Sequence, residues 1–140
     1  MEGPVWVRVE VPRGSFVKRR PDGSVDFVSP LPSPFDYGSI EDTLAPDGDP
    51  MDALILGRQR LVVGARVEVE VWGRVDMLDA GVPDPKCVCT IRGGGPPGER
   101  DWRRVWAFFA RYVRLKSALN WVRGAARPTR LLGVTRHPRR

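Results

Sequence analysis

The chain has 140 residues, of which 41% are hydrophobic, and a formal net charge of +6. Such a length and composition are those of one globular domain with a core of its own. No apolar stretch reaches the length of a membrane span and the N-terminus lacks the apolar core of a signal peptide, so we expect a soluble, cytoplasmic protein without a membrane partner.

The first half of the chain shows the alternation typical of strands. Val5, Val7, Val9 and Val11 alternate with more polar residues, as in a half-buried strand. Residues 16–27 indicate a hairpin that turns at residues 21–23, where Pro-Asp-Gly stands. Further strands are expected at residues 51–56, 65–72 and 87–91. The loop at residues 93–98 is rich in Gly and Pro but lacks the Lys-Ser/Thr and helix start of a phosphate-binding loop.

The last third predicts one amphipathic helix, from about residue 99 to residue 116. Its apolar residues recur at helical spacing, and its polar face is rich in arginine. Several short strands and one packed helix predict an α+β fold with a small closed barrel. We expect residues 1–127 to form a single domain and residues 128–140 to form a basic tail.

The cysteines and the histidine do not indicate a site. Cys87 and Cys89 lie on one face of an expected strand, and no further Cys or nearby His completes a zinc site. We expect both to be small core or half-buried residues. His137 stands in the basic tail, where a solvated side chain is the simpler interpretation.

The most informative segment is the DGDPMD run at residues 47–52. Asp47, Asp49 and Asp52 crowd three carboxylates together, which costs energy unless a cation lies among them. Hard oxygen ligands favour Mg²⁺, Mn²⁺ or Ca²⁺. A solvated acidic turn is the plain alternative for such a pattern.

The distribution of charge argues against that alternative. Residues 21–57 contain eight acidic residues and no Lys or Arg, whereas the remainder holds 23 basic and nine acidic residues. An acidic segment in a basic protein is consistent with a divalent cation opposite an anionic ligand, with phosphate as the natural candidate. Net charge alone also fits nucleic acid or a membrane surface. Asp79, Asp84 and Lys86 follow a strongly alternating strand and form a second, weaker pattern in a loop.

These residues resemble the soluble family I inorganic pyrophosphatases over roughly residues 5–112. The run at residues 47–53 is similar to that family's Asp-x-Asp-Pro-hydrophobic-Asp-hydrophobic signature. Other short matches occur in the same order as in the family. They are VEVP at residues 9–12, Lys18, the FDYG turn at residues 35–38 with Tyr37, the spacing of Asp79, Asp84 and Lys86, and FFARY at residues 108–112. The resemblance implies an OB-like five-stranded barrel and homo-oligomers.

The resemblance also implies roles for single residues. Asp47, Asp52 and Asp84 would hold one Mg²⁺, Asp52 would bridge to a second, and Asp79 with Asp84 would hold a third. Asp49 would take the proton of the attacking water, and metal coordination would lower the pKa of that water. The remaining implied residues are Lys18, Lys86 and Tyr112 at phosphate oxygens, Tyr37 beside the site, and Glu10 near metal or bound water.

Of three departures from the family pattern, two thin the phosphate-binding shell and the third could compensate for them. The family arginine before the Tyr-Gly turn is replaced by Phe27, Val28 or Ser29, and the lysine after Tyr112 is replaced by Val113. Arg20 stands where the family has an acid, and its guanidinium suits phosphate oxygens. The loss of one charged hydrogen bond to a transition-state phosphate costs roughly 2–4 kcal/mol. We therefore predict a slow or retuned enzyme.

Three functions are compatible with the sequence. The first is Mg²⁺-dependent hydrolysis of pyrophosphate to two phosphates, with Mn²⁺ as a possible substitute. The second is hydrolysis of a bulkier phosphoanhydride, such as a nucleotide or polyphosphate. The third is a non-catalytic polyanion or nucleic-acid binder, which the presence of Asp49 disfavours because a binder needs no base.

Overall fold

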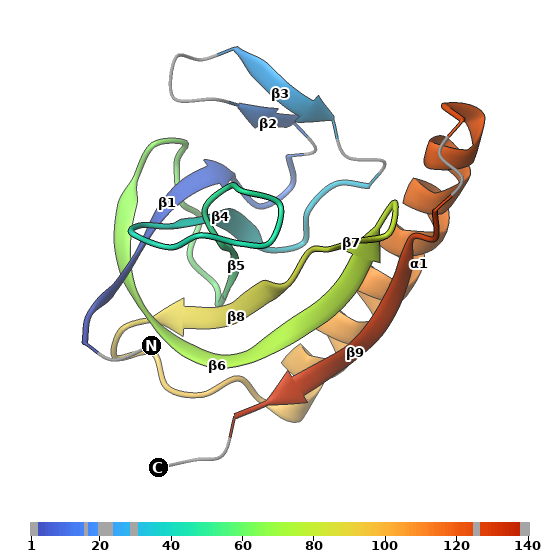
Figure 1. Cartoon of the computed structure of the whole chain (residues 1–140). Coiled ribbons are helices and arrows are strands. Elements are labelled where there is room, and N and C mark those ends of the chain that lie inside the picture. The colour runs from blue at the N-terminus through green and yellow to red at the C-terminus, as the bar shows by residue number, and fades with distance from the viewer. Residues whose placement is uncertain (1–2, 16, 20–23, 29–30, 125–126, 138–140) are drawn as a thin grey trace.

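A closed ring of five strands forms the centre of the protein (Figure 1). The computed structural model describes residues 3–15, 17–19, 24–28, 31–124 and 127–137. Neighbouring strands follow the order β1-β4-β5-β8-β6, and a pairing of β1 with the first part of β6 closes the ring. Within this ring β5 and β8 run parallel, and the other neighbouring strands run antiparallel. The ring strands are β1 (Val5–Val11), β4 (Asp36–Ile40), β5 (Asp52–Leu56), β6 (Arg66–Asp79) and β8 (Lys86–Ile91).

The expected α+β barrel with one main helix is thus confirmed. Helix α1 (Glu99–Val122) lies against the outer face of the ring, and the short strand β7 (Val82–Pro83) pairs antiparallel with the end of β6. The expected hairpin is present as β2 (Val17–Arg19) and β3 (Val25–Val28), a pair that stands apart from the barrel in Figure 1. Its turn at residues 21–23 lies outside the described residues.

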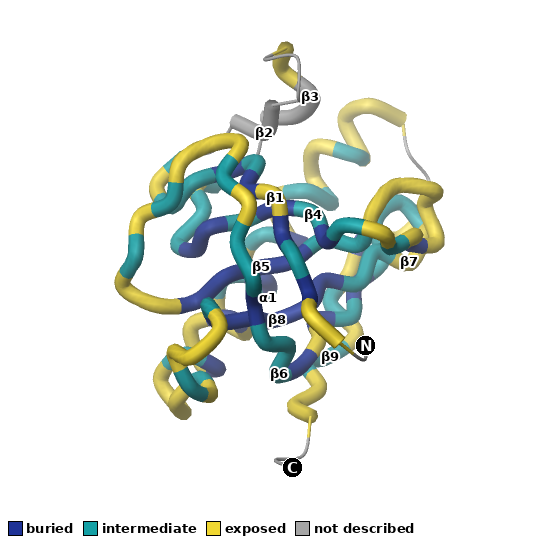
Figure 2. The backbone as a smooth tube through the Cα atoms, turned by 90° about the vertical axis from the view of Figure 1, so that its left-hand side faces the viewer, coloured by how far each residue is buried: buried dark blue, intermediate teal, exposed yellow. Residues whose placement is uncertain are grey.

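Two apolar clusters divide the core, one inside the ring and one beneath the helix. Val7, Ile40 and Ile55 belong to the inner cluster, where Cys87 and Cys89 are also buried, as expected. The outer cluster joins strand residues such as Leu54 and Val88 to the helix through Trp102, Val105, Phe109 and Val113. The buried segments of β5 and β8 lie at the centre of the molecule in Figure 2. Both faces of these two strands are covered, which explains why they are apolar without alternation.

Three element boundaries differ from those expected. Strand β6 continues past residue 72 to Asp79, because a register shift between Val71 and Gly73 accommodates Trp72 as the extra residue and the alternation resumes at Val75 and Met77. Helix α1 extends to Val122, although its last turns expose Leu119 and Trp121. Among the described residues no helix combines the length and apolar character needed to cross a membrane.

The third difference concerns the expected basic tail. Residues 130–136 form strand β9 (Arg130–Arg136), which pairs antiparallel with β6 and lies beside α1 (Figure 1). Thr129 is buried, and Leu131 and Val134 pack against the outer cluster. Because this segment is rich in arginine, its sequence does not indicate a strand, yet it pairs with the second half of β6. His137 follows β9 and is exposed, in agreement with the solvated side chain expected.

Candidate active site

Charged side chains converge where β5 and β8 begin. The two strands are parallel, and Asp52 and Lys86 are direct neighbours across them. The Lys86 ammonium lies 3.1 Å from Asp52 Oδ2 and 3.0 Å from Asp84 Oδ2. Lys86 is only 4% exposed, so this ammonium and its two carboxylates form a nearly desolvated ion-paired group. The sequence resemblance assigned Asp52 and Asp84 to metal and Lys86 to phosphate, and the fold brings the three side chains together.

Electrostatics places Asp47 near the same group. Burial raises the pKa of Asp84, Lys86 opposes that rise, and the negative charges of Asp52 and Asp47 reinforce it. Burial alone would lower the pKa of Lys86, but Asp52 and Asp84 outweigh it and hold the pKa above its usual value. Two carboxylates contact one ammonium and the charge of Asp47 also acts on Asp84, so negative charge is in excess, which a divalent cation would relieve.

Asp47 and Asp49 lie on the exposed loop between β4 and β5. The Asp49 amide donates a hydrogen bond to Asp47 Oδ1 (3.0 Å), and the Asp49 carbonyl accepts one from the Ala45 amide (2.7 Å). Gly48 has a φ of +89°, a conformation that favours glycine, so the turn can close here. The loop is therefore ordered by its own backbone, and both carboxylates remain accessible to solvent.

Two tyrosines flank the ion-paired group. Tyr37 lies on β4 with its ring centroid 5.5 Å from the Lys86 ammonium. Burial, the charges of Asp52 and Asp84, and a hydrogen bond with Asp52 all raise the pKa of Tyr37 well above its usual value. Tyr112 comes from α1, and its pKa is also raised by burial, although Lys116 and Lys86 lower it in part. Both phenols therefore stay protonated and can donate to phosphate oxygens.

Asp79 lies at the end of β6 and is held by the helix. Lys116 Nζ lies 3.0 Å from Asp79 Oδ2, and Asn120 Nδ2 donates to Asp79 Oδ1 at 3.0 Å. Asn120 also donates to Thr129 Oγ1 (2.8 Å), which accepts the Ala80 amide (2.9 Å). Sequence analysis missed Lys116, Asn120 and Thr129. The spacing of Tyr112, Lys116 and Asn120 at successive helical turns was the signal that could have found the first two.

The remaining predicted residues lie at the margin of the site or outside the described part. Glu10 is on β1, at the register shift opposite Tyr37. The backbone of Lys18 belongs to β2, but its side chain lies outside the described part of the chain, and so does all of Arg20. Val113 packs in the outer cluster and is 7% exposed, so no cation takes the place of the late-helix lysine at that position.

The donor chemistry of this site fits a divalent cation. Every candidate ligand is a carboxylate oxygen, and Asp84 shows the charge crowding that a cation relieves. Among the described residues no three carboxylate, histidine or cysteine side chains are grouped closely enough to hold a metal ion. Lys86 and Lys116 explain this, because Asp52, Asp84 and Asp79 each direct an oxygen at an ammonium. Metal binding would require these carboxylates to reorient.

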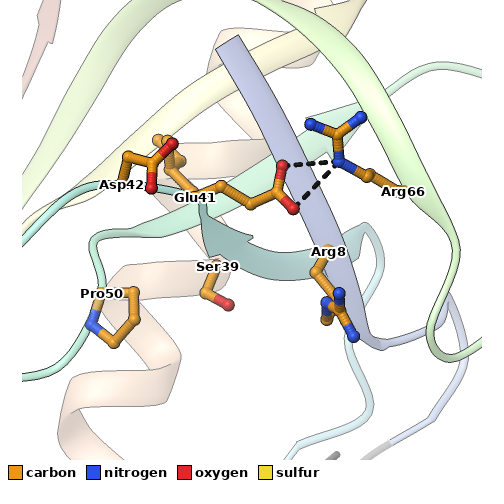
Figure 3. Close-up of a pocket in the computed structure, with 7 residues that line it drawn as sticks. Arg8, Ser39, Glu41, Asp42, Pro50 and Arg66 are labelled. Atoms are coloured by element: carbon orange, nitrogen blue, oxygen red, sulfur yellow. Dashed lines mark hydrogen bonds and ion pairs between the residues drawn. The ribbon is translucent and has the colours of Figure 1, made fainter.

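A shallow pocket of about 370 Å³ is lined by residues of β1, β4, the loop between β4 and β5, and the start of β6 (Figure 3). Arg66 Nε donates to both carboxylate oxygens of Glu41, at 2.9 and 2.7 Å. Figure 3 draws no such interaction between Arg8 and the other labelled residues. Register links the pocket to the site, because residues directly opposite each other on paired strands share a face. The resulting row across five strand segments is Arg66, Arg8, Ser39, Asp52 and Lys86.

Comparison with known proteins identifies the fold and its family. The family model for inorganic pyrophosphatase matches residues 7–94, from β1 to the loop after β8. The inorganic pyrophosphatase of Thermus thermophilus is 42% identical over 94 residues, which cover 62% of this chain and 54% of that protein. That of Saccharolobus solfataricus is 34% identical over 98 residues, which cover 65% of this chain and 57% of that protein. The chain therefore spans little more than half the length of these two relatives.

Solved structures extend the similarity to α1 and β9. The Thermus thermophilus pyrophosphatase structure has a TM-score of 0.75 at 33% identity and covers 94% of this chain and 82% of that one. The Neisseria gonorrhoeae structure has a TM-score of 0.74 at 25% identity and covers 96% and 83%. The resemblance drawn from the sequence motifs is confirmed. Because the family model matches more than half of its residues and the whole barrel superposes on solved members, the chain belongs to the inorganic pyrophosphatase family.

Proposed function

We propose that this protein hydrolyses inorganic pyrophosphate to two phosphates with Mg²⁺ as cofactor and water as the attacking group. The observation that carries the proposal is the convergence of Asp52 and Asp84 on Lys86, with the charge of Asp47 nearby. Carboxylates can bind a metal cation, and a buried ammonium can bind a phosphate oxygen. Hydrolysis of a metal-bound phosphoanhydride needs both kinds of group. Membership of the family implies a divalent metal cofactor, and Mg²⁺ is the specific choice that we propose for it.

Each residue has a defined part in this proposal. Asp47, Asp52 and Asp84 would hold one cation, Asp52 would contact a second, and Asp79 with Asp84 would hold a third, with Glu10 nearby. When bound, divalent cations lower the pKa of water and neutralise charge on phosphate. Asp49 takes the proton of the attacking water, since it lies exposed on the loop beside the other carboxylates.

The cationic and phenolic groups stabilise the departing phosphate. Lys86 lies among the carboxylates and offers a desolvated ammonium, whose interaction with a phosphate oxygen is stronger than in water. Tyr37 and Tyr112 donate phenolic protons that burial keeps in place. Lys18 and Arg20 remain predictions from the resemblance. A homo-oligomeric state and a cytoplasmic location are also predictions, to be tested by sedimentation and by fractionation.

Phosphate release from pyrophosphate tests the proposal. We expect release that depends on Mg²⁺, stops with a chelator, and falls strongly in Asp52→Asn, because that change removes a ligand carboxylate. The variant purified in parallel also controls for a contaminating host pyrophosphatase. No release at any Mg²⁺ or Mn²⁺ concentration would reject the proposal.

A second candidate is a longer phosphoanhydride as substrate, and the row from Arg8 to Asp52 favours it. Adjacent strands lie about 4.8 Å apart, so Arg8 is roughly 10 Å from Asp52, near enough for the third phosphate of a chain. Ser39, between them, leaves the pocket open (Figure 3). Tripolyphosphate tests this candidate. If the pocket binds the additional phosphate, Arg8→Ala raises KM for tripolyphosphate and leaves KM for pyrophosphate unchanged, whereas Arg58→Ala, another exposed arginine, changes neither.

A further inference from the structure

Helix α1 directs one line of polar side chains at the end of β6. Tyr112, Lys116 and Asn120 are spaced four residues apart, so they lie one above another on the same face. Lys116 and Asn120 each contact a different oxygen of Asp79, at 3.0 Å in both cases. The side chain of Lys116 is only 14% exposed, so its ammonium is held at the site instead of extending into solvent.

The charges of Lys116 and Lys86 both act on Tyr112. The Lys116 ammonium lies 5.9 Å from the Tyr112 ring centroid, and the charges of both lysines act on the phenol and lower its pKa against the effect of burial. The two ammonium groups also have matching partners, since Lys86 lies 3.0 Å from Asp84 and Lys116 lies 3.0 Å from Asp79. Two ammonium groups whose charges both reach one phenol offer donors for several phosphate oxygens.

No other cation of this part of the helix points to that site. Val113, next to Tyr112, is buried in the outer cluster. Arg111 and Arg114 are exposed, away from the residues beneath the helix. Lys116 is therefore the helix residue whose charge is directed at Asp79 and Tyr112.

We propose that Lys116 binds a phosphate oxygen of the substrate and that Asp79 is its partner only in the substrate-free protein. This inference rests on the proposed function and adds a substrate-positioning residue to it. A partly buried ammonium needs a counter-ion, which Asp79 provides. With substrate bound, Asp79 would hold a cation and a phosphate oxygen would take its place beside Lys116, so neither charge would be left without a partner.

Lys116 also connects the helix to Asp79, so the alternative is that Lys116 only stabilises the fold and does not bind substrate. Asn120 and Thr129 already make that connection, through Asp79 Oδ1 and the Ala80 amide. Two substitutions separate the roles. Lys116→Gln keeps a donor for Asp79 but removes the charge, and Lys116→Arg keeps the charge and gives it a planar donor set that suits phosphate.

The experiment measures KM and kcat for pyrophosphate together with the calorimetric Kd of methylenediphosphonate, a non-hydrolysable analogue, in Mg²⁺. We expect Lys116→Gln to raise KM and Kd by about 10- to 100-fold at an unchanged melting temperature, as for a lost charge-assisted hydrogen bond. Lys116→Arg should retain most of the affinity. Arg104→Ala removes an exposed positive charge from the same helix and should change neither constant.

Two results would overturn the inference. One is a Lys116→Gln protein with the KM and Kd of the wild type, because a donor to Asp79 would then suffice. The other is an equal loss in the Gln and Arg variants with a lowered melting temperature, which would make Lys116 a packing residue. If the wild-type chain releases no phosphate, the proposed function fails separately, while the Kd values for the analogue still decide the role of Lys116.

Discussion

Lys86 and Asp52 are paired across two parallel strands, with 3.1 Å between the ammonium and Oδ2 of the carboxylate. Asp84 lies 3.0 Å from the same ammonium, so one cationic group compensates two carboxylates. Because all three side chains are largely excluded from water, the charges depend on one another far more than an exposed ion pair does. A cation is required at this point of the fold, whether it belongs to a lysine or to a bound ion.

Lys86→Met tests that requirement. We expect the free energy of unfolding to fall by about 3–5 kcal/mol without divalent cations, since the change leaves two carboxylates uncompensated. Mg²⁺ should restore part of the loss, because a cation between Asp52 and Asp84 replaces the ammonium. Urea unfolding with and without Mg²⁺ measures both effects.

Arg92→Met is the matched control for that experiment. Arg92 is exposed in its ion pair with Glu68, so its removal should leave the free energy of unfolding nearly unchanged and should not respond to Mg²⁺. If Mg²⁺ stabilised Lys86→Met no more than it stabilises Arg92→Met, Asp52 and Asp84 would not be metal ligands.

Gly73 is the point where β6, β9 and α1 meet, and it should not accept a larger residue. A Cβ atom at Gly73 would lie 2.4 Å from the Thr135 carbonyl oxygen and 2.6 Å from the Trp102 ring. We expect Gly73→Ala to destabilise the protein by about 1–3 kcal/mol, because the β9 backbone and a buried indole must both move. Thermal unfolding measures the effect. Gly133→Ala in β9 meets nothing within 4 Å and should unfold near the wild-type temperature; equal melting of both variants would contradict the assigned role of β9.

The buried thiols predict how stability depends on pH. Burial raises the pKa of Cys89 well above its usual value and raises that of Cys87 as well. The folded state therefore retains these protons where the unfolded chain has lost them. The contribution of the two protonated thiols to stability is fully present below the ordinary thiol pKa. It is lost as the pH rises above that value, from about pH 8.5 upwards.

Urea unfolding between about pH 7 and pH 10 tests this dependence, and a thiol reagent gives a second measurement. We expect the denaturation midpoint to fall over the alkaline part of the range, with a smaller fall in a Cys87→Ala/Cys89→Ala double variant. Tyr37, whose pKa is also raised, contributes to the fall that remains. Native protein should not react with the reagent at neutral pH, and rapid labelling there would show that the thiols are accessible.

The sequence predicted the barrel because its strands carry clear local signals. The valines from Val5 to Val11 alternate with polar residues, and the apolar run from Ala53 to Leu56 fits a strand covered on both faces. Strand β9 carries no such signal. Arginines and the preceding Pro128 obscure its few apolar residues, and its conformation depends on the open edge of β6, which only the folded structure reveals.

The same contrast applies to the site. Asp47, Asp49 and Asp52 are close in sequence, so their crowding could be predicted from the chain itself. Lys116 meets Asp79 only because α1 packs along β6, and residues far apart in sequence are brought together by that packing. The four-residue spacing places Lys116 on the same helix face as Tyr112, but the sequence does not show that this face meets Asp79.

The most direct test of the central claim is the turnover of pyrophosphate by Asp49→Asn. Asp49 is exposed on a loop held by its own backbone, so the substitution removes a base without disturbing the fold. We predict that kcat falls by roughly 10²- to 10⁴-fold while Mg²⁺-dependent binding of methylenediphosphonate is retained. The control is Asp76→Asn, which changes an aspartate that is distant in sequence and paired with Arg74, and which should leave kcat unchanged. A wild-type kcat in Asp49→Asn would contradict the account, because the proton of the attacking water would then be taken elsewhere.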